Sequence, residues 1–232
     1  MKQVNFKIAA VTVAIFSALA VQAQAAIVVT EVAPWSSGNS PFLADWFELT
    51  NTGSSAVNIS GWKVDDNSNS FAASLALTGV TSINAGQSVI FIESATPATT
   101  NASFISTWFG ANAPAGLTIG NYSGAGIGLS TAGDAVNIYN ASGVLQANVT
   151  FGAADAVAPL QTFDNAAGLN NAAISLLSVA GVNGAFVAAS DLNEIGSPGT
   201  IAPVPEPSEY AMMLAGLAVV GGIARRRRIG FN

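Results

Sequence analysis

The chain has 232 residues, of which half are apolar and only 9% are charged, and its formal net charge is −6. Apart from Lys63 the basic residues lie at the two ends, so the region 26–203 sets eleven carboxylates against one lysine. Such a surface repels phosphate backbones and disfavours nucleic acid as a partner. The chain contains no Cys and no His, which excludes disulfides, thiolate nucleophiles and the usual proton shuttle near neutral pH.

The N-terminus has the pattern of an export signal. Two lysines precede an apolar run over residues 8–21, and the small-x-small stretch Ala23-Gln24-Ala25 follows. This order is typical of a secretory signal peptide over residues 1–25, cut by signal peptidase after Ala25. The alternative is an uncleaved anchor helix, for which the apolar run is short.

The region behind this signal alternates apolar and polar residues in short runs separated by Gly, Asn and Ser. The alternation predicts β-strands, and a nearly continuous apolar run predicts a strand that is buried on both faces at 88–94. Turns are expected at Ser60-Gly61 and at 141–143, the latter making a hairpin. Helices are expected only in the two terminal segments and in a short turn at 103–109. The predicted strands are 27–33, 45–51, 57–66, 88–94, 134–140, 145–152 and 173–180. Short strands with regular turns favour an all-β sandwich or barrel.

The strand sequences also resemble a known family. "IVVTEVAP", "DWFELTNTGSSAVNISGWKVDD", "INAGQSVIFI", "GLSTAGDAVNIYNASGVLQANVTFG" and "DLNEIGSPG" are similar to the lamin tail domain over about residues 27–199. The resemblance implies an immunoglobulin-like β-sandwich, which we place at 26–200. Two departures are a segment at 96–121 that looks like an insertion, and Phe186 at a position where the family usually has Trp.

Several residues have structural roles in such a sandwich. Trp46 and Trp62 are large enough to fill the space between two sheets. Asn51-Thr52-Gly53 can end a strand with positive φ angles. Asp134 follows Gly133 and can accept backbone N–H bonds at a turn.

The candidate site residues are carboxylates and amides. Asp65, Asp66, Asn67 and Asn69 offer oxygen ligands for Ca²⁺ in one loop. The loop does not fit an EF-hand, whose Gly and bidentate Glu positions are occupied here by Ser70 and Ala76. We therefore expect no cofactor, with Ca²⁺ left open as the alternative to a solvated turn.

A second set of carboxylates, Glu31, Asp45 and Glu48, lies on neighbouring predicted strands and is another candidate cluster. No catalytic constellation is expected, because a nucleophile needs a base and the sequence offers only Lys63 or a carboxylate. A glycosidase would need two carboxylates on a cleft, and nothing in the sequence pairs them. The glycine-rich stretch 120–130 lacks the lysine and helix of a phosphate-binding loop.

Two further tryptophans bear on possible partners. Trp35 and Trp108 have loop-like neighbours in the sequence, where they could stack on sugars or pack into the sandwich. Stacking would suit a role in binding exopolysaccharide or other envelope components.

The C-terminus has an apolar run, Tyr210 to Ala224, followed by Arg225, Arg226, Arg227 and Arg228. At about 1.5 Å rise per residue this run covers somewhat over 20 Å, against about 30 Å of hydrocarbon in a bilayer. It predicts a short single transmembrane helix at 210–224. The arginines stay in the cytoplasm, which places the domain outside.

Just before this run stands Pro205-Glu206-Pro207, an extended stretch suited to proteolysis. Pro-Glu-Pro, a short apolar helix and an arginine cluster together resemble the PEP-CTERM sorting signal of Gram-negative bacteria, here at 201–232. The resemblance implies cleavage by an exosortase-type transpeptidase after a transient stay in the inner membrane. The alternative is a plain C-terminal anchor.

These observations predict an exported, non-enzymatic protein of the cell surface or extracellular matrix that presents its β-sandwich for interaction. Two alternatives stay open. One is a secreted hydrolase that uses carboxylates, and the other is a permanently anchored subunit of an envelope complex.

Overall fold

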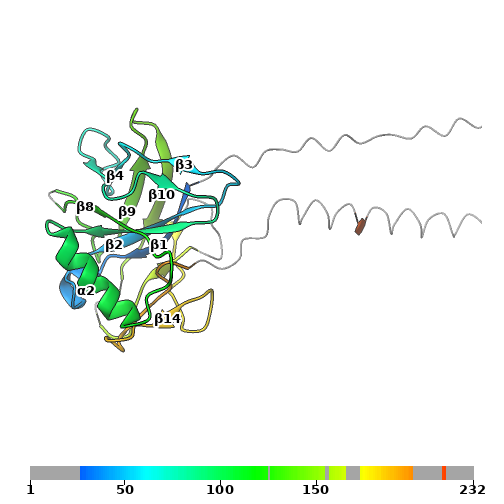
Figure 1. Ribbon diagram of the computed structural model, residues 1–232. Coiled ribbons are helices and arrows are strands. Elements are labelled where there is room, and N and C mark those ends of the chain that lie inside the picture. Colours follow the sequence, from blue (N-terminus) through cyan, green and yellow to red (C-terminus); the bar gives the residue numbers. More distant parts are fainter. Residues whose placement is uncertain (1–26, 125, 155–156, 166–172, 201–215, 218–232) are drawn as a thin grey trace, which may run out of the picture.

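The computed structural model describes residues 27–124, 126–154, 157–165, 173–200 and 216–217 (Figure 1). Two five-stranded sheets face each other and form a β-sandwich. The first sheet has the order β12-β1-β2-β7-β8, in which only β7 and β8 pair in parallel. Its strands are β1 (Ile27–Ala33), β2 (Trp46–Asn51), β7 (Ser88–Glu93), β8 (Ile119–Tyr122) and β12 (Phe163–Asp164).

The second sheet has the order β13-β10-β9-β4-β5, with β10 and β13 parallel and the other pairs antiparallel. Its strands are β4 (Lys63–Asp65), β5 (Leu75–Ala76), β9 (Asp134–Tyr139), β10 (Leu145–Phe151) and β13 (Ala173–Ile174). Two small sheets complete the described part of the chain. They contain β3 (Val57–Asn58) with β6 (Ser82–Ile83), and β11 (Leu160–Gln161) with β15 (Glu194–Gly196) and β14 (Phe186–Val187).

The predicted strands are confirmed with local corrections. The segment 57–66 does contain a turn at Ser60-Gly61, but its two halves belong to different sheets, as β3 and β4. The hairpin between β9 and β10 is present. The late strand expected at 173–180 is reduced to β13 and an isolated bridge between Leu177 and Phe163.

The inner core lies between the two sheets. It is made by the apolar residues that alternate along each strand, such as Phe47 and Phe91 in the first sheet and Val136 and Val149 in the second. Trp62 is buried in this core, as the sequence predicts. The same core contains Tyr122, whose ring is tilted against that of Phe47 at 5.5 Å.

A second core covers the outer face of the first sheet. Helix α2 (Pro97–Phe109) packs there (Figure 1). It begins at a proline, and the residue that caps its C-terminal end is Gly110, which has a φ of 58°. Phe104 and Trp108, one turn apart on α2, face Trp46 with edge-on ring contacts at 5.6 and 5.7 Å. The expected short turn at 103–109 is therefore the second half of a longer helix, and the segment 96–121 supplies both this helix and most of β8.

This second core corrects the prediction for Trp46 and decides between the two alternatives for Trp35 and Trp108. Trp46 points to the helix and not into the space between the sheets. Trp108 and Trp35, which precedes the short helix α1 (Ser36–Asn39), are each only 1% exposed, so neither can stack on a sugar in solvent. The indole N–H of Trp35 donates to Gln161 O at 2.8 Å.

The sequence predicts positive φ angles where β2 ends, and this prediction is wrong. None of the residues Asn51, Thr52 and Gly53 has a positive φ. The Asn51 side chain ends the strand instead, since it accepts from Gly53 N and donates to the carbonyl oxygens of Ser55 and Ile83.

The predicted export and sorting segments lie outside the described residues. These are the signal peptide 1–25 with its cleavage after Ala25, the Pro205-Glu206-Pro207 motif, the arginines 225–228, and the apolar run 210–224 except for Gly216 and Leu217. Within the part of the chain that the structure covers, no helix has the length and apolar character that a bilayer span requires.

We predict that Trp108→Ala lowers the free energy of unfolding by about 3–5 kcal/mol, because it leaves a cavity between α2 and the first sheet. Urea unfolding followed by far-UV circular dichroism measures this. Leu192→Ala is the control, because Leu192 is 77% exposed and its loss should cost under about 0.5 kcal/mol. Equal costs for the two variants would show that α2 does not depend on Trp108.

Candidate functional site

The first candidate site lies on the outer face of the second sheet, where the 66–74 loop joins β4 to β5. Asp65, the last residue of β4, is buried, and its Oδ2 accepts hydrogen bonds from Ser68 Oγ at 2.7 Å and Ser70 N at 2.6 Å. Asp66 Oδ1 accepts from Ser68 N at 2.8 Å. These two carboxylates therefore shape the loop from within.

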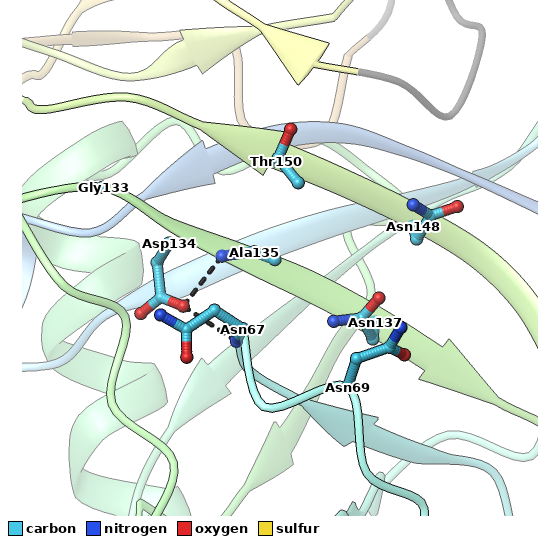
Figure 2. A pocket seen from close by; sticks show the side chains of 8 residues that line it. All are labelled: Asn67, Asn69, Gly133, Asp134, Ala135, Asn137, Asn148 and Thr150. Carbon is cyan, nitrogen blue, oxygen red and sulfur yellow. Dashed lines mark hydrogen bonds between the residues drawn. The ribbon is translucent and has the colours of Figure 1, made fainter.

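Asp134, at the start of β9, attaches this loop to the sheet. Its Oδ1 accepts from Asn67 N at 2.9 Å and from its neighbour Ala135 N at 2.8 Å (Figure 2). Its Oδ2 accepts from Ser130 N at 2.8 Å. The preceding Gly133 has a φ of 112°, a conformation that residues other than glycine rarely adopt. The expectation that Asp134 accepts backbone N–H bonds at a turn is confirmed.

Between the loop and the sheet lies a pocket with a volume of about 330 Å³, which we call the polar pocket. Figure 2 shows loop side chains on one side of it and side chains of β9 and β10 on the other. Its described lining residues are Asn67, Asn69, Gly133, Asp134, Ala135, Asn137, Asn148 and Thr150. Side-chain amides dominate this lining.

Some of the polar side chains in this lining form hydrogen bonds to other described residues, and others do not. Asn137 Nδ2 donates to Asp66 O at 2.6 Å, and the Tyr139 hydroxyl donates to Asn69 Oδ1. Within the described part of the chain, the side chains of Asn148 and Thr150 make no hydrogen bond to protein. The pocket therefore contains polar groups that have no hydrogen-bond partner among the described residues.

The predicted Ca²⁺ loop is only partly gathered at this pocket. Asn67 and Asn69 line it, whereas Asp65 and Asp66 direct oxygens at loop backbone. Among the residues that the structure describes, no three acidic side chains come close enough together to hold a metal ion. Ca²⁺ binding by Asp65, Asp66, Asn67 and Asn69 stays a prediction.

The second candidate cluster is split by the structure. Asp45 lies apart and accepts from Ser37 N at 2.8 Å. Glu31 and Glu48 stand directly opposite each other on β1 and β2, and a β-bulge at Thr30 turns Glu31 to the outer face of the first sheet. Both side chains are fully buried, and we call them the carboxyl pair.

The carboxyl pair binds the end of the domain. Glu31 Oε1 accepts from Thr162 Oγ1 at 2.5 Å and from Ser197 N at 2.6 Å. Glu48 Oε2 accepts from Gly199 N at 2.6 Å, and its Oε1 accepts from Thr30 Oγ1 at 2.7 Å. The four residues 197–200, which we call the closing segment, are thus attached to the first two strands of the sandwich.

This attachment requires close approach of the backbone. A Cβ on Gly196 would lie 2.7 Å from Glu31 Oε1 and 2.9 Å from the Trp108 ring, so only glycine fits between them. The closing segment therefore lies directly on the carboxyl pair and beside α2.

Burial sets the protonation of these groups. It raises the pKa of Glu48 to about 7, against the effect of the hydrogen bonds that Glu48 accepts. The pKa of Glu31 is raised well above its ordinary range, first by burial and then by the charge of Glu48. Burial also raises the pKa of Asp45 and of Glu194 to about 7. Burial therefore favours the protonated form of the carboxyl pair.

Lys63 and the glycine-rich stretch 120–130 were the other candidates for chemistry. The Lys63 ammonium lies 4.8 Å from the centre of the Phe71 ring, on the outer face of the second sheet. The glycine-rich stretch 120–130 starts within β8.

Sequence reasoning missed Asn137, Asn148 and Thr150. Their alternation with apolar residues marks them as the polar face of β9 and β10. That signal is the same for an ordinary solvated strand, and only the fold of the 66–74 loop over this face turns it into a pocket.

The raised pKa values predict that stability falls as pH rises. Between about pH 4.5 and 7 the folded protein holds a proton on Glu48 that the unfolded chain releases, so the free energy of unfolding decreases across this range. We predict that Glu48→Gln, which cannot ionise, reduces the loss between pH 5 and 8 by on the order of 2 kcal/mol.

Urea unfolding at both pH values measures this loss. Leu192→Ala is the control, because Leu192 is exposed, and its replacement changes no ionisable group and should leave the pH dependence unchanged. A wild-type protein that gains stability from pH 5 to 8 would contradict the burial of the carboxyl pair.

Comparison with known families agrees with this architecture. The Lamin Tail Domain model matches residues 20–153, and the model of the PEP-CTERM protein-sorting motif matches residues 203–228. The first match does not extend to β11–β15, although the sequence resemblance was expected to reach Gly199. No curated protein and no solved structure matches the chain.

The sorting motif is that of exported proteins processed by an exosortase, and the lamin tail domain is a non-catalytic, immunoglobulin-like fold. The chain belongs to the lamin tail domain family.

Proposed function

We propose that this protein is an exported, exosortase-sorted component of the cell surface or extracellular matrix, and that its β-sandwich is a non-catalytic interaction domain. The observation that carries the proposal is the order of the parts. The sorting motif matches from residue 203, directly after the closing segment at 197–200.

The position of the closing segment supports processing of the tail. The Ser197 and Gly199 N–H groups bind the carboxyl pair, and all residues of the two cores precede them in the chain. Cleavage near Pro205-Glu206-Pro207 would remove none of the described residues that form the two cores. We therefore expect the described fold to survive removal of the tail.

The proposed route follows from the two ends. Signal peptidase cuts after Ala25, and the apolar run 210–224 then stops transfer in the inner membrane. The arginines 225–228 stay in the cytoplasm, so the sandwich lies outside. An exosortase-type transpeptidase then cleaves at the motif and releases the domain to the surface.

Two features support a non-catalytic role. The carboxyl pair has no access to a substrate, because both side chains are fully buried under the closing segment. The exposed polar pocket contains one acid, Asp134, and both of its oxygens accept backbone N–H bonds. A hydrolase of the two-carboxylate type needs two acids at its binding site. The described lining of this pocket supplies one.

The test is the intact mass of the protein from its own cells. We predict a wild-type protein that begins at Ala26 and ends near Pro205-Glu206-Pro207. Glu206→Ala should retain the arginines 225–228 and stay with the membrane. Glu209→Ala, which changes an acid beyond the motif, is the matched control and should be processed normally.

Two outcomes would contradict the proposal. Wild-type protein that keeps the arginines would be a permanently anchored envelope subunit. Wild-type protein that keeps residues 1–25 in the cytoplasm would not be exported.

A further inference from the structure

We propose that the polar pocket is a binding site for an uncharged saccharide. This inference names a ligand class for the interaction domain and rests on the proposed function for the claim that the pocket faces envelope or matrix material. The site itself is argued from the chemistry of its lining.

The pocket offers donors and acceptors in pairs. A side-chain amide presents a carbonyl oxygen and an NH₂ group side by side, and a sugar hydroxyl both donates and accepts. Asn148 and Thr150 lie two residues apart on the outward face of β10, and Asn67 and Asn69 approach from the loop (Figure 2). Asn137 contributes its Oδ1, because its Nδ2 already donates to Asp66 O.

Among its described lining residues, the pocket has no basic side chain, and its one acid is hydrogen-bonded to backbone N–H groups. None of the eight described lining residues is Lys or Arg. Asp134 is the only acid among them, and three backbone N–H groups occupy its two oxygens. An anion would find no counter-charge among these residues, and three of the roughly four lone-pair positions of Asp134 that a cation would use already accept N–H bonds. The lining therefore favours a polar ligand without charge.

The pocket is also held in place before any ligand arrives. Asp65 binds Ser70 N, Asp134 binds Asn67 N, and the Tyr139 hydroxyl binds Asn69 Oδ1. These contacts fix the loop over the sheet, so little conformational entropy remains to be lost on binding. The volume of about 330 Å³ lies at the lower end of the range for small-molecule sites, which suits one or two sugar rings.

Binding is tested by isothermal titration calorimetry on the full-length chain at pH 7, in a detergent without a sugar headgroup. The probes are neutral oligosaccharides of two to four units built from glucose, galactose, mannose or N-acetylglucosamine. We expect at least one of them to bind, and Asn148→Ala to weaken its binding about tenfold, the effect of one lost hydrogen bond in a site of this kind.

Two further variants separate a direct contact from damage to the fold. Asn148→Asp keeps the shape but removes the NH₂ donor, and should weaken binding without a change in melting temperature. Asn112→Ala removes an exposed amide outside the pocket and should bind like wild type.

The inference fails if no oligosaccharide binds at millimolar concentration, or if Asn148→Ala and Asn112→Ala bind equally well. Binding of Ca²⁺ or of a peptide at these residues in place of sugar would also overturn it. The intact mass from cells is an independent readout. A correctly processed chain that binds no saccharide would leave the proposed function standing, whereas a misrouted chain that binds one would overturn the proposed function alone.

Discussion

The structure depends on two carboxyl groups buried side by side. Glu31 and Glu48 lie opposite each other on the first two strands of the sandwich, out of contact with water. Burial of two ionised carboxylates would cost far more than a small domain can tolerate. Raised pKa values, which favour the neutral form, reduce that cost. The backbone N–H groups of Ser197 and Gly199 and the hydroxyls of Thr30 and Thr162 also offset it. The beginning of the domain is thereby attached to its end.

Because of this attachment, the outer faces of the two sheets are covered to different extents. The first sheet is covered on its outer face by α2 and by the closing segment, so its strands are buried on both sides. Among the described residues, the 66–74 loop lies on the outer face of the second sheet. Strand β9 is buried along its length, whereas β10 alternates between buried and solvent-facing residues. A surface for partners is therefore expected on the second sheet. The polar pocket lies there.

Much of the fold could be predicted from the sequence, because the period of two in the strands depends only on which residues face the inner core. The β9–β10 hairpin and the burial of β7 follow from this pattern. The bulge at Thr30 could not be predicted in this way. Strict alternation from Val29 would place Glu31 in the inner core, and one extra residue moves it to the other face.

The same limit applies to the site. Trp46 and Trp108 contact each other across a strand and a helix that are far apart in the sequence, so no local pattern shows that they are buried together. Asn67 and Asn69 were found as polar loop residues, but their neighbours on β9 and β10 were not. The acids of that loop serve its own backbone, a role that depends on how the loop bends rather than on its composition.

The central claim is that the domain is complete at its closing segment, before the sorting motif begins. Amide hydrogen exchange at Ser197 and Gly199 tests it most directly, measured in the full-length chain and in a chain that ends at Ala202. We expect strong and equal protection of both amides in the two chains, because their acceptors are Glu31 and Glu48. Exchange at the rate of an exposed loop, or loss of protection in the shorter chain, would contradict it.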